Sequence, residues 1–158
     1  MLHIDPANAG TLKAGMLDWA KQFSILVFLD NNTYPSLYDG YECLLAAGAR
    51  SFADNTGADP LAQLQQAHDH APDWMFGHIC YDYKNRLEPG LSSVHHGGHE
   101  YPPLQFFVPD TVCYINRSQS CFTIETFDDP EVIFQAISRY TVLPGSRGLP
   151  QVSFTGFA

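Results

Sequence analysis

A cluster of potential metal ligands stands at His95, His96, His99 and Glu100. Imidazole nitrogens and a carboxylate are ligands that zinc or nickel accepts. A metal site also needs a backbone that holds its ligands in place, and two glycines separate these histidines within a segment, residues 88–103, that is rich in Pro, Gly, His and Ser. A small metallohydrolase centre and a solvated loop are both open interpretations. We favour the loop and predict no metal ligands.

A second polar group follows directly on an apolar run that ends at Leu29. Asp30, Asn31 and the residues up to Tyr34 form an acidic, amide-rich segment at the end of a predicted strand. A rigid strand end is a common place for a small-molecule pocket. An ordinary turn remains the alternative, because Asn, Asp and Pro favour turns for backbone reasons alone.

The segment from Trp74 to Glu88 changes from strand-like to charged at Asp82. Lys84 and Arg86 follow within a few residues. Pairing of these opposite charges would fix the turn after the strand. Part of a binding surface is the alternative, and we favour local pairing.

The chain has four cysteines, and no two of them form a CxxC pair. They are Cys43, Cys80, Cys113 and Cys121. Their wide spacing within apolar or strand-like stretches predicts reduced, buried thiols. A nucleophilic cysteine with a histidine partner stays open as the functional alternative. No set of residues has convincing catalytic spacing, so we predict no catalytic residue in this chain.

The elements that position these residues are predicted from caps and periodicity. Three Asp-Pro pairs indicate helix starts at Pro6, Pro60 and Pro130, since Asp caps free N–H groups and Pro suits the first helical position. Gly10 and Gly15 weaken the first helix, whose apolar face begins near residue 10. Strands are expected over 23–30, 41–52, 74–83, 104–108, 111–116 and 121–127.

The polar connection at residues 117–120 is short enough for a hairpin, which makes at least part of the sheet antiparallel. The sequence therefore predicts an α+β fold, with a largely antiparallel sheet flanked by about three helices. We expect one domain over residues 1–143 and a linker or truncated tail over 144–158.

Composition narrows the class of protein. The chain has 158 residues and a formal net charge of −9, which disfavours binding to nucleic acid or to an anionic membrane surface. No apolar run approaches the ~20 residues that cross a bilayer, and the N-terminus has no signal pattern. These features predict a cytoplasmic protein.

Three segments resemble one family in their order and spacing. They are Phe28-Leu29-Asp30-Asn31, then Gly77 through Tyr81-Asp82 with Glu88 beyond, and Pro103 through Asp110. Over roughly residues 15–127 the chain resembles component I of aminodeoxychorismate (para-aminobenzoate) synthase and its relative, component I of anthranilate synthase. The middle segment looks nearer the aminodeoxychorismate branch.

The resemblance implies a non-catalytic N-terminal domain that forms one half of a larger sandwich. Its partners would be the C-terminal chorismate-binding domain of the same subunit and, in the full complex, a glutaminase subunit (component II). The full-length enzyme would aminate chorismate for folate biosynthesis and would require magnesium. The family's catalytic residues belong to the other domain, and no cofactor is expected in this one.

The resemblance also implies a ligand. The family's N-terminal domain can hold tryptophan beside a Leu-Leu-Glu-Ser strand end, and here Asp30 and Asn31 stand at the Glu and Ser positions. On this basis Leu29, Asp30, Asn31 and Tyr81 are the expected residues of a tryptophan-type pocket. A free-standing small-molecule-binding regulatory domain is the alternative function.

Overall fold

The structure is a computed structural model that describes residues 2–3, 9–35, 40–53, 59–88, 90–92, 102–117 and 121–139. Its elements in chain order are β1 (Leu2–His3), α1 (Ala9–Ala20), β2 (Leu26–Asp30), β3 (Tyr41–Ala47), β4 (Ser51–Ala53), α2 (Pro60–His70), β5 (Phe76–Ile79), a 3₁₀ turn (Tyr81–Tyr83), α3 (Lys84–Leu87), β6 (Leu104–Val108), β7 (Thr111–Asn116), β8 (Cys121–Thr126) and α4 (Pro130–Ser138). This mixture of helices and antiparallel strands confirms the predicted α+β class.

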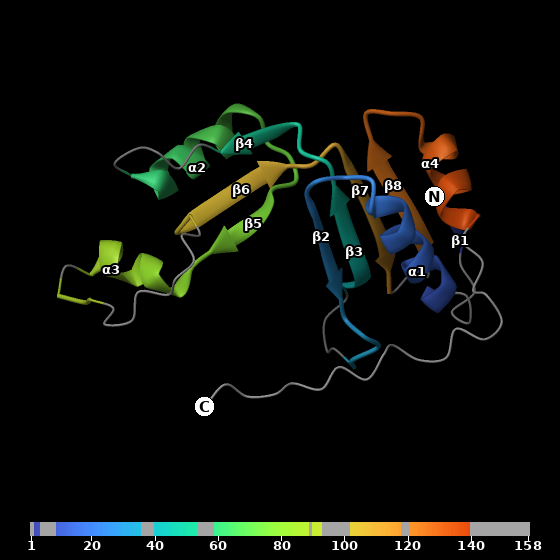
Figure 1. Cartoon of the computed structure of the whole chain (residues 1–158), viewed down its shortest axis with the longest axis horizontal. Helices are drawn as coiled ribbons and strands as arrows, with labels where there is room; N and C mark the ends of the chain where they lie inside the picture. Colours follow the sequence, from blue (N-terminus) through green and yellow to red (C-terminus); the bar gives the residue numbers. More distant parts are fainter. Residues whose placement is uncertain are drawn as a thin grey trace.

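The strands form two sheets, and every pairing within the described residues is antiparallel (Figure 1). The larger sheet has the order β1-β8-β7-β3-β2, and the smaller has the order β4-β6-β5. The predicted hairpin is present, because β7 pairs with β8 from Thr111 opposite Thr126 to Asn116 opposite Cys121. In Figure 1 the smaller sheet and α2 lie to one side of the larger sheet.

The single strand predicted over 41–52 is wrong, because the chain leaves the larger sheet at Gly48 and enters the smaller one as β4. Gly48 has a φ of +75°, a left-handed conformation that does not continue a strand. A Cβ at this position would also clash with the side chain of Asp110. One apolar run in the sequence therefore contributes a strand to each sheet.

Side chains of β3 alternate between two separate hydrophobic cores. Cys43, Leu45 and Ala47 face α1 and α4, which cover one side of the larger sheet. The buried members of this core are Met16, Ala20, Cys43, Leu45, Ala47, Cys113, Ile115, Phe122, Ile133 and Ile137. We call this side the helix face.

The opposite side, which we call the second face, packs against the smaller sheet. Leu44 and Ala46 of β3 and Val112 of β7 are buried here with Phe76 and Phe107 of the smaller sheet. The period of two along β3 therefore decides which core each residue joins.

Two of the three predicted helix starts are confirmed. α2 begins at Pro60 and α4 at Pro130. Their caps are Asp59, which accepts from the Ala62 N–H at 3.0 Å, and Asp129, which accepts from the Glu131 N–H at 2.9 Å. α1 is described from Ala9, while Pro6 lies outside the described residues.

The strand predicted over 74–83 is shorter than expected. β5 ends at Ile79, and a 3₁₀ turn and the short helix α3 follow. Lys84 does pair with Asp82 at 3.6 Å, as the charge pattern indicates, and its ammonium lies over the Tyr81 ring. The histidine cluster at 95–99 and the predicted tail at 144–158 lie outside the described residues.

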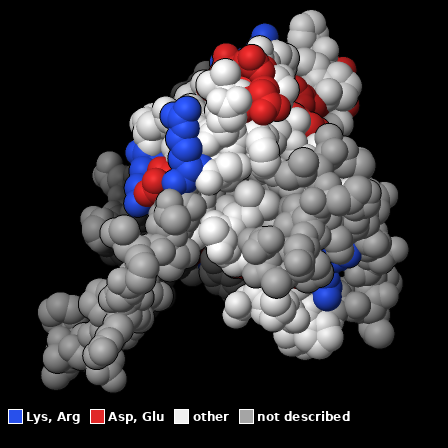
Figure 2. All heavy atoms as spheres, turned by 90° about the vertical axis from the view of Figure 1, so that its right-hand side faces the viewer, with Lys and Arg blue, Asp and Glu red and all other residues white. Residues whose placement is uncertain are grey.

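Charge is unevenly distributed on the face shown in Figure 2. Acidic side chains gather toward the top of this view, and basic side chains lie mostly apart from them. Among the described residues of this face, the basic side chains form no continuous surface for an anionic polymer. Within the described ranges, no helix combines the length and apolarity needed to cross a membrane.

Candidate functional site

A charged cluster lies at the end of β2 on the helix face. Lys13 of α1 places its Nζ 2.7 Å from Asp30 Oδ1 and 2.7 Å from Glu42 Oε1. The side chains of Lys13 and Glu42 are 14% and 13% exposed, and that of Asp30 is 33% exposed. One ammonium therefore bridges two carboxylates in a largely desolvated position.

A β-bulge turns Glu42 toward this cluster. Asp30 pairs with Cys43, but the register of β3 against β7 shifts between Tyr41 and Cys43. Glu42 is the extra residue in this shift, and bulges are a common means of redirecting a side chain. Its carboxylate consequently reaches Lys13 on the helix face.

The turn after β2 also directs polar groups to the cluster. The Tyr34 N–H donates to the Asn31 carbonyl at 3.0 Å, and the two central residues, Asn32 and Thr33, have φ values of 51° and 58°. Their N–H groups donate to Asp30 Oδ1 at 2.8 Å and to Glu42 Oε1 at 3.1 Å. A β-branched residue such as Thr33 rarely adopts positive φ, and the strain costs about 1–3 kcal/mol.

These contacts set the ionisation of the cluster. Burial alone would raise the pKa of Asp30, but hydrogen bonds from Lys13 and the Asn32 N–H lower it below 3.8. Burial likewise opposes ionisation of Glu42, yet Lys13 and the Thr33 N–H bring its pKa below 4.5. The pKa of Lys13 is raised above 10.5, because its two hydrogen-bonded carboxylates outweigh the effect of burial. All three groups are therefore charged at neutral pH.

Beside the cluster is a cavity of about 680 Å³ between α1, the end of β2 and the end of β7. Its lining combines the charged groups above with Arg117, two polar turn residues and an apolar wall. The lining residues are Ala9, Gly10, Lys13, Ala14, Leu17, Phe28, Asp30, Asn32, Thr33, Glu42, Ile115, Asn116 and Arg117. Its volume and mixed lining are typical of a small-molecule site.

The four residues expected for a tryptophan-type pocket do not line this cavity together. Asp30 does, whereas Leu29 points to the second face, because neighbouring strand residues alternate, and is 56% exposed. Asn31 starts the turn and donates its side-chain amide to the Tyr34 carbonyl at 2.8 Å. Tyr81 follows β5 of the other sheet and is 83% exposed. The ligand role of these residues stays a prediction.

Lys13, Glu42 and Arg117 were missed by sequence reasoning. For Lys13 the sequence did contain a signal of a functional role, since it is the only charged residue between Pro6 and Leu17. For Glu42 the sequence contained no such signal, because the orientation of its side chain depends on the bulge. Arg117 was assigned to the hairpin connection on its polarity alone.

The cysteines are unpaired thiols, and three of the four are buried. Burial raises the pKa of Cys43 to about 11 and that of Cys113 to about 12, so neither is a thiolate at neutral pH. The prediction of burial is wrong for Cys80, which is partly exposed and donates weakly to the Pro102 carbonyl at 3.4 Å.

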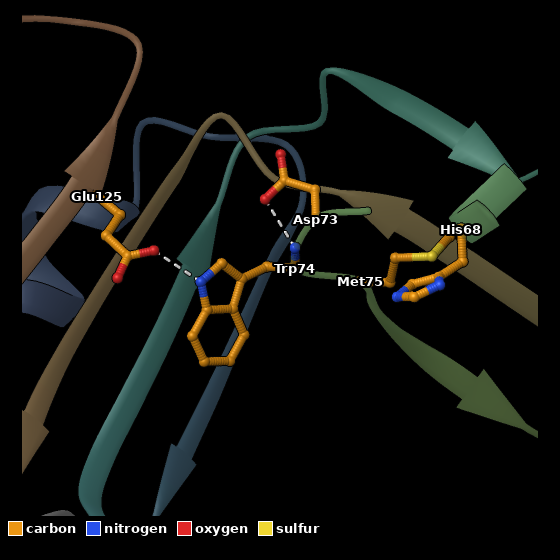
Figure 3. Close-up of a pocket in the computed structure, with 5 residues that line it drawn as sticks. All are labelled: His68, Asp73, Trp74, Met75 and Glu125. Atoms are coloured by element: carbon orange, nitrogen blue, oxygen red, sulfur yellow. Dashed lines mark hydrogen bonds between the residues drawn. The ribbon is translucent and has the colours of Figure 1, made fainter. Parts of the chain in front are cut away.

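A shallower hollow lies near the smaller sheet and is shown in Figure 3. The Trp74 indole N–H donates to Glu125 Oε2 at 2.7 Å, and the Tyr114 hydroxyl donates to Glu125 Oε1 at 2.8 Å. His68, Asp73 and Met75 complete the lining. These hydrogen bonds connect the second face of the larger sheet to the chain that enters β5.

Neither a protein-family model nor a curated protein matches the chain. In the part of the chain that the structure describes, no three or more His, Cys, Asp or Glu side chains are grouped to hold a metal ion. Fold and site together define an α+β protein with a ligand-sized cavity on its helix face.

Proposed function

We propose that the chain is the non-catalytic N-terminal domain of component I of aminodeoxychorismate synthase. In this role it scaffolds the chorismate-binding domain and holds a small amino-acid ligand such as tryptophan. The order of the three family-like segments motivates the proposal. The observation that carries it is that two large apolar side chains of the larger sheet stay exposed on the second face.

These side chains are Leu29 and Tyr41, which are 56% and 42% exposed. The Tyr41 ring lies against two further rings, with centroids 5.0 Å from Tyr114 and 6.0 Å from Trp74. An apolar surface on an ordered sheet is a common feature of protein interfaces. Under the proposal, the chorismate-binding domain covers it and completes the sandwich.

A binding experiment tests the scaffold role. The chain is mixed with a separately expressed chorismate-binding domain of an aminodeoxychorismate synthase component I, and the complex is measured by analytical ultracentrifugation. We expect a complex that is weakened by Leu29→Glu or Tyr41→Glu. Val132→Glu is the matched control, since Val132 is 61% exposed on α4 of the opposite face. An unchanged complex with both surface variants would refute the proposed interface.

A second assay concerns catalysis. With chorismate, ammonia and magnesium, the chain alone should give no aminated or cleaved product. Measurable turnover by the purified chain, lost on removal of the chain by affinity capture, would contradict a non-catalytic role.

The alternative function, a free-standing regulatory domain, is favoured by one observation: the cavity at Asp30 has the volume and mixed lining of a small-molecule site. Ligand binding at this cavity without any complex with a chorismate-binding domain would support the alternative. Complex formation would support the scaffold.

A further inference from the structure

We propose that the cavity on the helix face binds a small organic carboxylate with an apolar body, and that Arg117 holds its carboxylate group. The inference rests on the ligand-binding part of the proposed function and does not depend on the scaffold role. It adds the residue that recognises the ligand and widens the ligand class from amino acids to simple carboxylates.

Among the described residues, Arg117 has a single, distant ion-pair partner. Its Nε lies 3.8 Å from Glu42 Oε2, which is beyond hydrogen-bond distance, and Glu42 is its only ion-pair partner within the described residues. The side chain is 27% exposed and lines the cavity. A guanidinium presents its donors as a planar fork, which matches the two oxygens of a carboxylate.

Helix α1 forms the wall of the cavity beside Arg117. Ala9 and Gly10 of α1 line the same cavity as Arg117. Both are small residues, so they leave room for an anionic group next to the guanidinium.

The two carboxylates of the site do not cancel the charge of Arg117. Lys13 bridges Asp30 and Glu42 at 2.7 Å each and offsets much of their charge. Asp30 and Arg117 therefore offer groups of opposite charge in the same cavity. A simple carboxylate uses Arg117, and a free amino acid could also place its ammonium at Asp30.

The remaining wall suits an apolar body. Phe28, Leu17, Ala14 and Ile115 line the cavity, and its volume of about 680 Å³ exceeds what a single ring requires. Burial of a ring against these side chains supplies affinity, while Arg117 supplies orientation.

Three matched compounds test the inference by isothermal titration calorimetry of the whole chain. Hydrocinnamate has the carboxylate and the ring, phenylalanine has the ammonium as well, and phenethylamine lacks the carboxylate. We expect hydrocinnamate and phenylalanine to bind at least about tenfold more tightly than phenethylamine, since a charged hydrogen bond is worth that factor or more. The ratio between the two carboxylates shows whether the site favours an acid or an amino acid.

Variants locate the site. Arg117→Gln should weaken carboxylate binding at least about tenfold, and Arg139→Gln, at the C-terminal end of α4, should leave it unchanged. Gly10→Leu is a second variant that keeps the fold, because a Cβ at Gly10 meets nothing within 4 Å and leucine favours helices. Its side chain should block the cavity. Equal affinity for phenethylamine, or full binding by both Arg117→Gln and Gly10→Leu, would overturn the inference, whatever the outcome of the complex measurement.

Discussion

Replacing Lys13 by methionine tests the charged cluster, since it keeps the length of the side chain and removes the ammonium. Asp30 and Glu42 then lose their shared partner while remaining only 33% and 13% exposed. An exposed ion pair contributes about 0–1 kcal/mol, and removing one partner of a fully buried pair costs about 3–5 kcal/mol. For this partly buried cluster we expect a loss of about 2 kcal/mol in the free energy of unfolding.

For a domain of this size, a loss of about 2 kcal/mol lowers the melting temperature by roughly 4–8 °C. Circular dichroism melts at neutral pH measure it. Lys21→Met is the matched control: Lys21 is 73% exposed and pairs with Asp18 one helical turn away, so its loss should stay within about 0.5 kcal/mol.

The effect of pH has a defined sign. The ordinary pKa values of Asp30 and Glu42 are 3.8 and 4.5, and folding lowers both. The stability that the two carboxylates contribute is therefore fully present above their ordinary pKa values. It is lost as the pH falls through their lower, folded-state pKa values. The difference between wild type and Lys13→Met should therefore be largest at neutral pH and shrink below about pH 4.5. Equal stability of the two proteins at neutral pH, or a difference that grows on acidification, would refute the assigned ion pairs.

Other predictions address the fold and the ligand. Gly77→Ala should destabilise the fold by about 1–3 kcal/mol in urea titrations, because the new Cβ would lie 2.7 Å from the Phe106 Cα and clash with the Gln105 carbonyl; a stability within error of wild type would contradict this packing. A thiol reagent should modify Cys80 first, and Cys43 only on unfolding, because burial holds the Cys43 pKa at about 11; modification of Cys43 at the rate of Cys80 would show that the core is open. Tryptophan at about a hundred times its dissociation constant should add about 2.7 kcal/mol of stability in a thermal-shift titration, and no shift at millimolar tryptophan would count against a tryptophan pocket in this chain.

Local signals predicted much of the fold. The caps at Asp59 and Asp129 locate two helices, and the bounds of β6 and β7 agree with their apolar runs. These features depend on neighbouring residues, which the sequence shows directly.

The features that were missed depend on distant parts of the chain. The local sequence does not show that residues 41–52 contribute strands to two different sheets. This division requires the close approach of Gly48 to Asp110, which is distant in the sequence. In the candidate site, the polar strand end drew attention to Asp30, which lines the cavity; its ligand role stays a prediction. Its partners Lys13 and Glu42 were not found, since one comes from a helix 17 positions earlier and the other depends on a bulge.

Under the proposed function, this chain is a non-catalytic domain whose second face is covered by a chorismate-binding domain. The most direct measurement is the mass of the species formed when the two purified proteins are mixed, determined by sedimentation equilibrium. We expect a heterodimer that Leu29→Glu weakens and Val132→Glu does not. If the folded wild-type chain and the chorismate-binding domain sediment as two separate proteins, the proposed function is contradicted.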